Sequence, residues 1–163
     1  MNPSSVTRGK RLAIAAVATI VGLTPSAAMA VSCSVSTLST DFGLYNPLSA
    51  APLSTTGSIN IACTCTNILD CVAFGYRIDV SAGQSGNTAA REMRAGTGRL
   101  LYNLYSDPGY NSVWGTGNAG SSMLYLVTLF GTRQTATVYA RVPARQAVPA
   151  GNYSDTPIIT IVY

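Results

Sequence analysis

The residues best able to do chemistry in this chain are its four cysteines, Cys33, Cys63, Cys65 and Cys71. An even cysteine count in an exported chain of this size predicts disulfides, with three possible connectivities. Zinc is the competing interpretation, but the chain has no histidine and thiols outside the cytoplasm tend to be oxidised. We therefore expect no metal and no cofactor. The pairing that we favour joins Cys33 to Cys63 and Cys65 to Cys71.

Catalytic arrangements find little support in the sequence. Without histidine there is no Ser-His or Cys-His pair, and the only lysine, Lys10, precedes the mature chain, so a P-loop is also excluded. Gly115, Gly117 and Gly120 match the spacing of a dinucleotide fingerprint, but they follow Trp114 in a loop and precede no helix. The acidic residues are more simply turn and surface groups than a glycosidase pair. They are Asp41, Asp70, Asp79, Glu92, Asp107 and Asp155. We therefore expect no enzyme.

The first thirty residues have the anatomy of a secretory signal peptide. Arg8, Lys10 and Arg11 precede an uncharged apolar run at 12–23, and a small-residue series follows at 26–30. The run is shorter than the ~20 residues of a spanning helix, so we expect cleavage after Ala30 and no transmembrane segment in the mature chain, 31–163. Removing the three cations lowers the formal net charge from +4 to +1. Nothing then favours nucleic acid as a partner.

The mature chain has an all-β composition. It is rich in Ser, Thr, Val, Ile and Tyr, with turn residues at short intervals and no long amphipathic helical pattern. A polar connection is expected at 83–98 and a second, which contains Trp114, at 110–122. The expected strands are Ser32–Leu38, Ser58–Thr66, Phe74–Ser81, Leu100–Tyr105, Met123–Thr128, Thr135–Val142 and Ile158–Tyr163.

The last stretch of the chain predicts a strand with an open edge. A turn at 149–152 precedes Tyr153, and Ile159, Ile161 and Tyr163 then recur at strand spacing among β-branched neighbours. No further strand follows in this sequence to pair with it, so we expect an edge that another chain completes.

The aromatic residues admit two interpretations. Trp114, Tyr102, Tyr139 and Tyr153 lie in or beside expected strands, where aromatic side chains usually pack the core. A sugar-stacking platform is the alternative, because aromatic faces bind the apolar faces of sugars. We favour core packing for these four.

Six short stretches occur in a fixed order between the first cysteine and the final aromatic residue. They are DFGLYNPL (41–48), GSINIACT (57–64), LYNLYSD (101–107), VWG (113–115), VYARVP (138–143) and VPAGNYSD (148–155). With these stretches, the region 33–163 resembles the spore coat protein U domain family.

The resemblance implies an incomplete immunoglobulin-like, pilin-type β-sandwich that lacks its last strand, as in subunits of archaic chaperone-usher pili. The partner-strand groove would then include Ile158, Ile159, Ile161, Val162 and Tyr163. The implied partners are a periplasmic chaperone, an outer-membrane usher and the donor strand of another pilin-like subunit. We therefore expect a secreted structural or assembly protein, either a pilin-like subunit or a surface-coat component, that passes through the periplasm to the cell surface.

Two features depart from the family pattern. After cleavage only Val31 and Ser32 precede Cys33, which is too short for a donor strand, so we expect this chain to accept a strand and not to donate one. The Cys65 to Cys71 loop has no role that the resemblance supplies.

The alternative function is a tip adhesin that binds a surface or a glycan.

Overall fold

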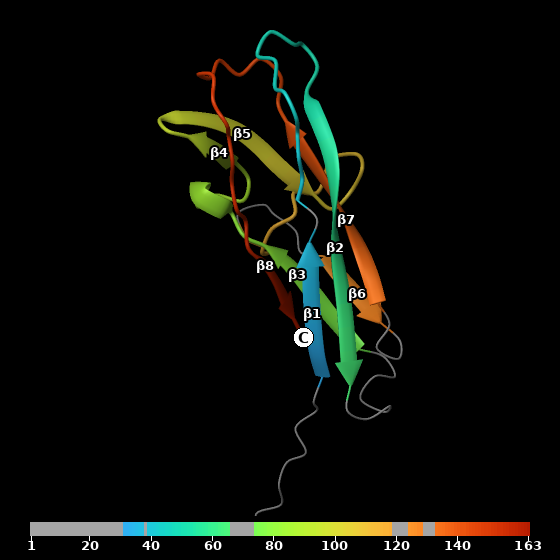
Figure 1. The fold of residues 1–163 in the computed structure, drawn as a ribbon. Helices are drawn as coiled ribbons and strands as arrows, with labels where there is room; N and C mark the ends of the chain where they lie inside the picture. The colour runs from blue at the N-terminus through green and yellow to red at the C-terminus, as the bar shows by residue number, and fades with distance from the viewer. Residues whose placement is uncertain (1–30, 38, 66–73, 119–123, 129–132) are drawn as a thin grey trace, which may run out of the picture.

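Two antiparallel sheets form the fold in the computed structural model, which describes residues 31–37, 39–65, 74–118, 124–128 and 133–163 (Figure 1). The larger sheet has the strand order β1-β2-β7-β5-β4, and the smaller has the order β6-β3-β8. The strands are β1 (Val31–Thr37), β2 (Leu53–Cys65), β3 (Phe74–Val80), β4 (Arg91–Ala95), β5 (Gly98–Tyr105), β6 (Leu124–Thr128), β7 (Arg133–Val142) and β8 (Ile159–Val162). A short 3₁₀ turn, η2 (Gly83–Ser85), precedes β4.

The core lies between the two sheets and follows the alternation along the strands. Every second residue of a strand faces the same side, so one set from each strand is buried and the other faces out. The buried set comprises Ile59, Ile61 and Cys63 of β2, Tyr76, Ile78 and Val80 of β3, Leu100, Tyr102 and Leu104 of β5, and Ala136, Val138, Ala140 and Val142 of β7. The all-β class predicted from the sequence is therefore confirmed.

Trp114 ties the two sheets together from the connection between β5 and β6. Its side chain is fully buried, and its indole Nε1–H donates to the carbonyl of Ile78 on β3 at 2.9 Å. Its backbone N–H donates to the carbonyl of Leu104 on β5 at 2.8 Å. The same residue thus bonds to one strand of each sheet, which fixes the distance between them.

Arg91 is a second buried tie and carries the only buried charge among the core residues that the structure describes. Its guanidinium makes five hydrogen bonds, and all five acceptors are neutral. They are the carbonyls of Ser81 (2.9 Å), Thr88 (3.3 Å), Val80 (2.9 Å) and Trp114 (2.7 Å), and Oδ1 of Asn103 (2.7 Å). Burial lowers the pKa of Arg91, while nearby Tyr102 and Asp155 oppose that shift.

The prediction of a strand-free connection at 83–98 is wrong, because this segment contains η2 and the strand β4. Arg91, Glu92 and Arg94 gave this segment a polar appearance. Yet Arg91 and Met93 both face the core, so β4 has the alternation of a strand with a charged residue at one buried position.

Among the other expected strands, β2 begins five residues earlier than expected, since its first residues pair with β7 from Leu53 onward. Thr66 and Met123 lie outside the described residues.

Three of the four aromatic residues expected in the core belong to it or pack against it. Trp114 and Tyr102 are buried, and Tyr153 is partly buried against the core cluster. Tyr139 differs, because it lies between the inward-facing Val138 and Ala140 and therefore on the outer face of β7, where it is half-buried. Burial raises the pKa of Tyr102, as does its hydrogen bond to Asp155, so its hydroxyl remains a donor.

Replacing Arg91 tests whether the buried guanidinium holds the sheets together. We expect Arg91→Met to keep much of the buried volume but to remove the donor to the carbonyls of Val80 and Trp114, which costs about 3 kcal/mol or more of unfolding free energy. Urea unfolding measures this. Arg99→Met on β5 is the matched control; its side chain is 43% exposed, and the expected change is below about 0.5 kcal/mol. Equal effects of the two variants would contradict this role.

Candidate strand-acceptor opening

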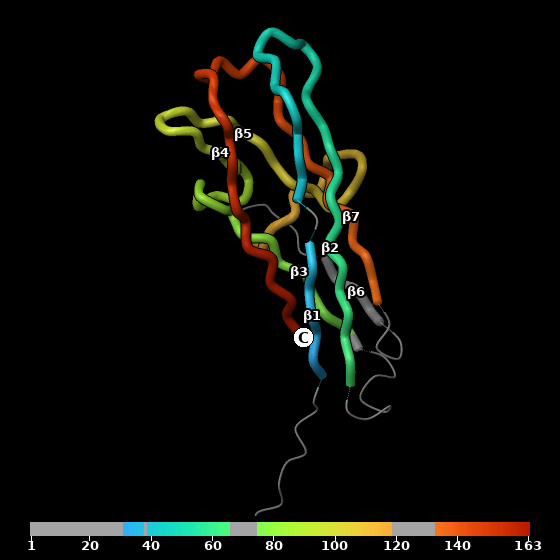
Figure 2. Tube along the Cα trace, in the orientation of Figure 1, coloured from blue at the N-terminus to red at the C-terminus, as the bar shows by residue number. Residues whose placement is uncertain are grey.

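The two sheets each end in an edge strand on the same side of the molecule. β1 pairs only with β2, and β8 pairs only with β3, among the described residues. Figures 1 and 2 trace the segment that follows β1 and the segment that precedes β8 along the length of the molecule. Among the described residues no backbone ladder joins β1 to β8, so each of these strands has one edge without a strand partner.

The inner face of β1 is incompletely covered. Cys33, Val35 and Thr37 stand opposite Cys63, Ile61 and Ile59 of β2, so they share the core face with those residues. The three β2 residues are 1–2% exposed, whereas Val35 is 39% exposed. An apolar side chain that faces the core but remains exposed indicates that its neighbour on one side is missing.

The inner face of β8 shows the same incompleteness. Ile159 and Ile161 stand opposite Val80 and Ile78 of β3, which are at most 1% exposed, yet both remain only partly buried. Val162 stands opposite Arg77 and therefore lies on the outer face.

The groove set predicted from the sequence is accordingly divided. Ile159 and Ile161 border the opening, whereas Val162 belongs to the other face and Ile158 is 69% exposed before the strand begins. Tyr163, at 60% exposed, follows the parity of Ile161. Strand alternation within 158–163 explains this division, since a continuous apolar run cannot present all its side chains to one side.

An upper cleft of about 510 Å³ continues the opening beyond the strands. One wall is the segment 40–47, which contains Phe42 and Tyr45, and the other is the segment 148–153. The floor consists of core side chains, namely Met93, Leu100 and Val142. Sequence reasoning missed these residues. The two walls do correspond to the stretches 41–48 and 148–155, so these two motifs were the signal in the sequence that could have indicated the cleft.

Hydrogen bonds hold the rings of the upper cleft in place. The Tyr45 hydroxyl donates to the Pro143 carbonyl at 3.0 Å and accepts from the Gln146 amide at 2.7 Å. The Tyr153 hydroxyl donates to the Pro149 carbonyl at 2.8 Å. The cleft is therefore a preformed concavity with fixed aromatic walls.

The segment that leads into β8 is bonded along one edge. The backbones of Ser154 and Arg94 bond to each other at 2.9 and 3.2 Å, and those of Ser81 and Ile158 follow at 2.9 Å. Asp155 adds side-chain bonds, because its carboxylate accepts the Tyr102 hydroxyl at 2.8 Å and the Gln84 amide at 2.9 Å. These hydrogen bonds hold β8 and the segment before it along one edge, and the other edge of β8 faces the opening.

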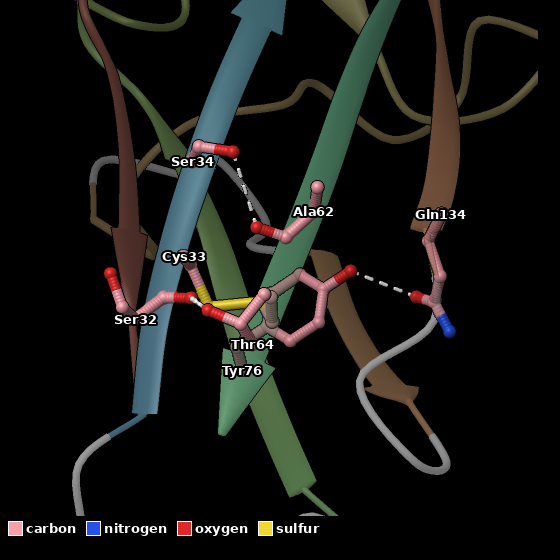
Figure 3. Close-up of a disulfide and its surroundings, with 8 residues drawn as sticks. Ser32, Cys33, Ser34, Ala62, Thr64, Tyr76 and Gln134 are labelled. Carbon is pink, nitrogen blue, oxygen red and sulfur yellow. Dashed lines mark hydrogen bonds between the residues drawn. A yellow bond between two sulfur atoms is a disulfide. The ribbon is translucent and has the colours of Figure 1, made fainter. Parts of the chain in front are cut away.

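A disulfide fixes the β1 wall. Cys33 and Cys63 are directly opposite across β1 and β2, and their sulfur atoms are bonded at 2.11 Å (Figure 3). Figure 3 also shows the side-chain bonds beside it, Ser34 Oγ to the Ala62 carbonyl at 3.3 Å and Thr64 Oγ1 to the Ser32 carbonyl at 3.4 Å. Cys65 is also disulfide-bonded. Cys71 lies outside the described residues, so its pairing stays a prediction.

The described residues contain neither a cluster of metal-ligating side chains nor a helix long and apolar enough to cross a membrane. The features with clear geometry are the open edges, the half-buried inner residues and the upper cleft. Together they can bind an extended segment, because a free strand edge offers backbone hydrogen bonds and the concave floor accepts apolar side chains.

Comparison with known proteins decides the family. The model of the Spore Coat Protein U domain matches residues 19–160. This chain belongs to that family. A curated relative, Protein U of Myxococcus xanthus, is 32% identical over 130 residues, which cover 76% of this chain and 70% of the relative. The resemblance read from the six stretches is thus confirmed.

One solved structure supports the fold of this Spore Coat Protein U domain. A chain in the CsuC–CsuE chaperone–tip adhesion subunit pre-assembly complex, from archaic chaperone-usher Csu pili of Acinetobacter baumannii, is similar with a TM-score of 0.55 and 20% identity. The match covers 82% of this chain but only 40% of that chain. The minor tip subunit HdaB of the E. coli Hda pilus is similar at a TM-score of 0.41 and 17% identity, over 78% of this chain and 79% of HdaB.

Removing the disulfide tests how β1 is retained. The crosslink closes a loop of 30 residues, and the chain-entropy relation gives roughly 3.6 kcal/mol for a loop of that length. We expect the double variant Cys33→Ser, Cys63→Ser to lose about that much unfolding free energy in urea. Ser34→Ala, which removes one exposed hydrogen bond on the same strand, should change it by less than about 0.5 kcal/mol. A double variant as stable as the parent would show that the β2 ladder alone holds β1.

Proposed function

We propose that this Spore Coat Protein U domain is a secreted structural subunit that accepts a β-strand from another protein into the opening between β1 and β8. The observation that carries the proposal is the contrast in burial on a single face. Val35, Ile159 and Ile161 remain partly exposed, although their partners on β2 and β3 are at most 1% exposed. The core therefore lacks the side chains that one more strand supplies.

The donated strand has a defined chemistry. It bonds through its backbone to the free edges of β1 and β8 and places alternate apolar side chains against the half-buried inner residues. At the upper end it covers Leu100 and Met93 between the walls at 40–47 and 148–153. We infer that the donors are a periplasmic chaperone during export and a pilin-like neighbour after delivery by an outer-membrane usher. The chain then serves as a pilus subunit or a surface-coat component, not as an enzyme.

The tip-adhesin alternative uses the same fold but needs one feature more. An adhesin requires a ligand site outside the opening, because the opening is occupied by the donated strand in the assembled state. The two roles are therefore distinguished by whether the outer surface binds a ligand of its own.

A fused strand tests acceptance directly. We expect a strand of alternating apolar and polar residues, joined after Tyr163 by a short flexible linker, to turn an aggregation-prone mature chain into a monomer. Burying about four apolar side chains in the opening should add about 5 kcal/mol or more to the unfolding free energy. Urea unfolding and light scattering measure both effects. The control fusion has the same composition in an order without alternation.

Two substitutions on β8 sharpen this test. Ile161→Asn places an amide on the inner face, so the gain from the fused strand should fall by about 2 kcal/mol or more. Thr160→Asn is one residue away on the outer face and should leave the gain within about 0.5 kcal/mol. The proposal fails if the mature chain alone is a cooperative, monodisperse monomer that the alternating strand stabilises no more than the control strand does.

A further inference from the structure

Two of the six sequence stretches place only some of their residues in the core. Residues 101–107 lie on and after β5, and residues 138–143 lie on and after β7. Tyr102 and Val138 pack inward, and Asn103 is buried as well. The outer face of the larger sheet carries the remaining strand members, namely Leu101, Tyr105, Tyr139 and Arg141. The strand-accepting opening explains none of these outer residues.

The outer residues converge on a second cleft of about 480 Å³, which lies across β5 and β7. Its lining is mostly apolar, and Arg141 is the only charged residue in the described lining. Its main walls are formed by Pro52, Leu101, Tyr105, Arg141, Pro143 and Ala144. We call this concavity the outer cleft.

The guanidinium of Arg141 stacks on an aromatic ring. It lies 4.9 Å from the centre of the Tyr110 ring. That ring in turn packs edge to face against Tyr105, with centroids 5.3 Å apart and an interplanar angle of 88°. Within the described residues no hydrogen bond or ion pair reaches the Arg141 guanidinium or either phenol hydroxyl. A guanidinium in this arrangement is oriented, yet all its donors are available to a ligand.

The loop at 107–112 holds the Tyr110 ring in position. Tyr110 has a φ of 57°, a left-handed conformation that costs free energy for a residue with a bulky side chain. The Asp107 carboxylate accepts the backbone N–H groups of Gly109 (3.1 Å), Asn111 (3.1 Å) and Ser112 (2.7 Å). These hydrogen bonds, that from Ser112 above all, lower the pKa of Asp107. The carboxylate therefore stays ionised and continues to accept the loop's N–H groups.

From these observations we infer that the outer cleft binds an acidic saccharide through its carboxylate. The planar fork of Arg141 matches a carboxylate, with which a guanidinium forms paired hydrogen bonds. Tyr105 lines the cleft and provides an aromatic ring and a hydroxyl suited to a sugar ring, while Tyr110 orients Arg141 from beside the cleft. The volume accommodates one or two sugar rings.

A peptide fits this cleft less well. The Leu101 amide donates to Gln146 Oε1 at 2.8 Å, and the Leu101 carbonyl accepts from Gln146 Nε2 at 2.9 Å. The backbone of β5 beside the cleft is therefore already capped and cannot add a strand. A single guanidinium is also not the clustered cationic face that a nucleic acid needs.

The outer cleft is independent of the strand-accepting opening. Leu101, Tyr105 and Arg141 reach it from the outer face, and it shares no lining residue with the upper cleft. Its occupant therefore does not compete with a donated strand, and failure of one proposal leaves the other standing.

Isothermal titration calorimetry of the full mature chain in its soluble form tests the inference. The probes are digalacturonate, the neutral disaccharide galactobiose and inorganic phosphate. We expect saturable binding of digalacturonate that weakens with salt, and at least roughly tenfold weaker binding of the other two. Arg141→Gln should weaken digalacturonate binding by roughly tenfold or more, and Arg141→Lys by several-fold because the fork is lost.

The matched control is Arg133→Gln, because Arg133 is an exposed residue on the same face of β7 and lies outside the outer cleft. It should leave the affinity unchanged. An unaltered urea midpoint checks that each variant is folded. The inference is overturned by equal affinity for the acidic and neutral sugars, by phosphate binding as tightly as digalacturonate, by equal effects of the two glutamine variants, or by no saturable binding at millimolar concentrations.

Discussion

The buried guanidinium of Arg91 is the interaction on which the rest of the structure depends. It takes acceptors from the end of β3, from the segment before β4, from β5 and from Trp114. A buried charge is tolerated only when its donors are satisfied, so these elements can meet in one arrangement only. The end of β3 in turn bonds through Ser81 to Ile158, where β8 begins. The position of one wall of the opening thus depends on an arginine in the opposite sheet.

An open side imposes a second constraint, because each edge strand must be held by one neighbour. The segment before β8 is held by the hydrogen bonds of Asp155 to Tyr102 and of Ser154 to Arg94, and β1 is crosslinked to β2 by a disulfide. These attachments lie on the sides of the strands away from the opening or on their inner face. The free edges are therefore rigid enough to act as a template, and the half-buried Val35, Ile159 and Ile161 remain as the apolar surface that a partner covers.

The two faces of the larger sheet have different chemistry within the same stretches of sequence. Along β7, small and branched residues such as Val138 and Ala140 fill the core, and Tyr139 and Arg141 occupy the outer face between them. A strand can serve two purposes in this way because its side chains alternate. The inner set completes the sandwich and supports strand acceptance, while the outer set brings a stacked guanidinium to a surface cleft.

The sequence by itself determined the all-β class, the alternation of β2 and β3 and the family. It favoured the pairing of Cys33 with Cys63 among three connectivities, and the structure contains that disulfide. These features are local, or follow from a period of two along a single strand and from the order of short stretches. Tertiary structure alone decided which residues border the opening. Alternation places the apolar neighbours Ile161 and Val162 on opposite faces, but only their pairing with Ile78 and Arg77 decides which of the two faces the core.

The same reason explains the strand that sequence reasoning missed. Arg91 looks like a surface residue in its own segment, and it becomes a core residue because five acceptors converge on it, four of them ten or more residues away in the chain. The upper cleft and the stacking of Arg141 on Tyr110 likewise join segments that are far apart in the chain. A hydrophobic pattern reports which side a residue faces, but whether another segment covers that side is decided only when the whole chain has folded.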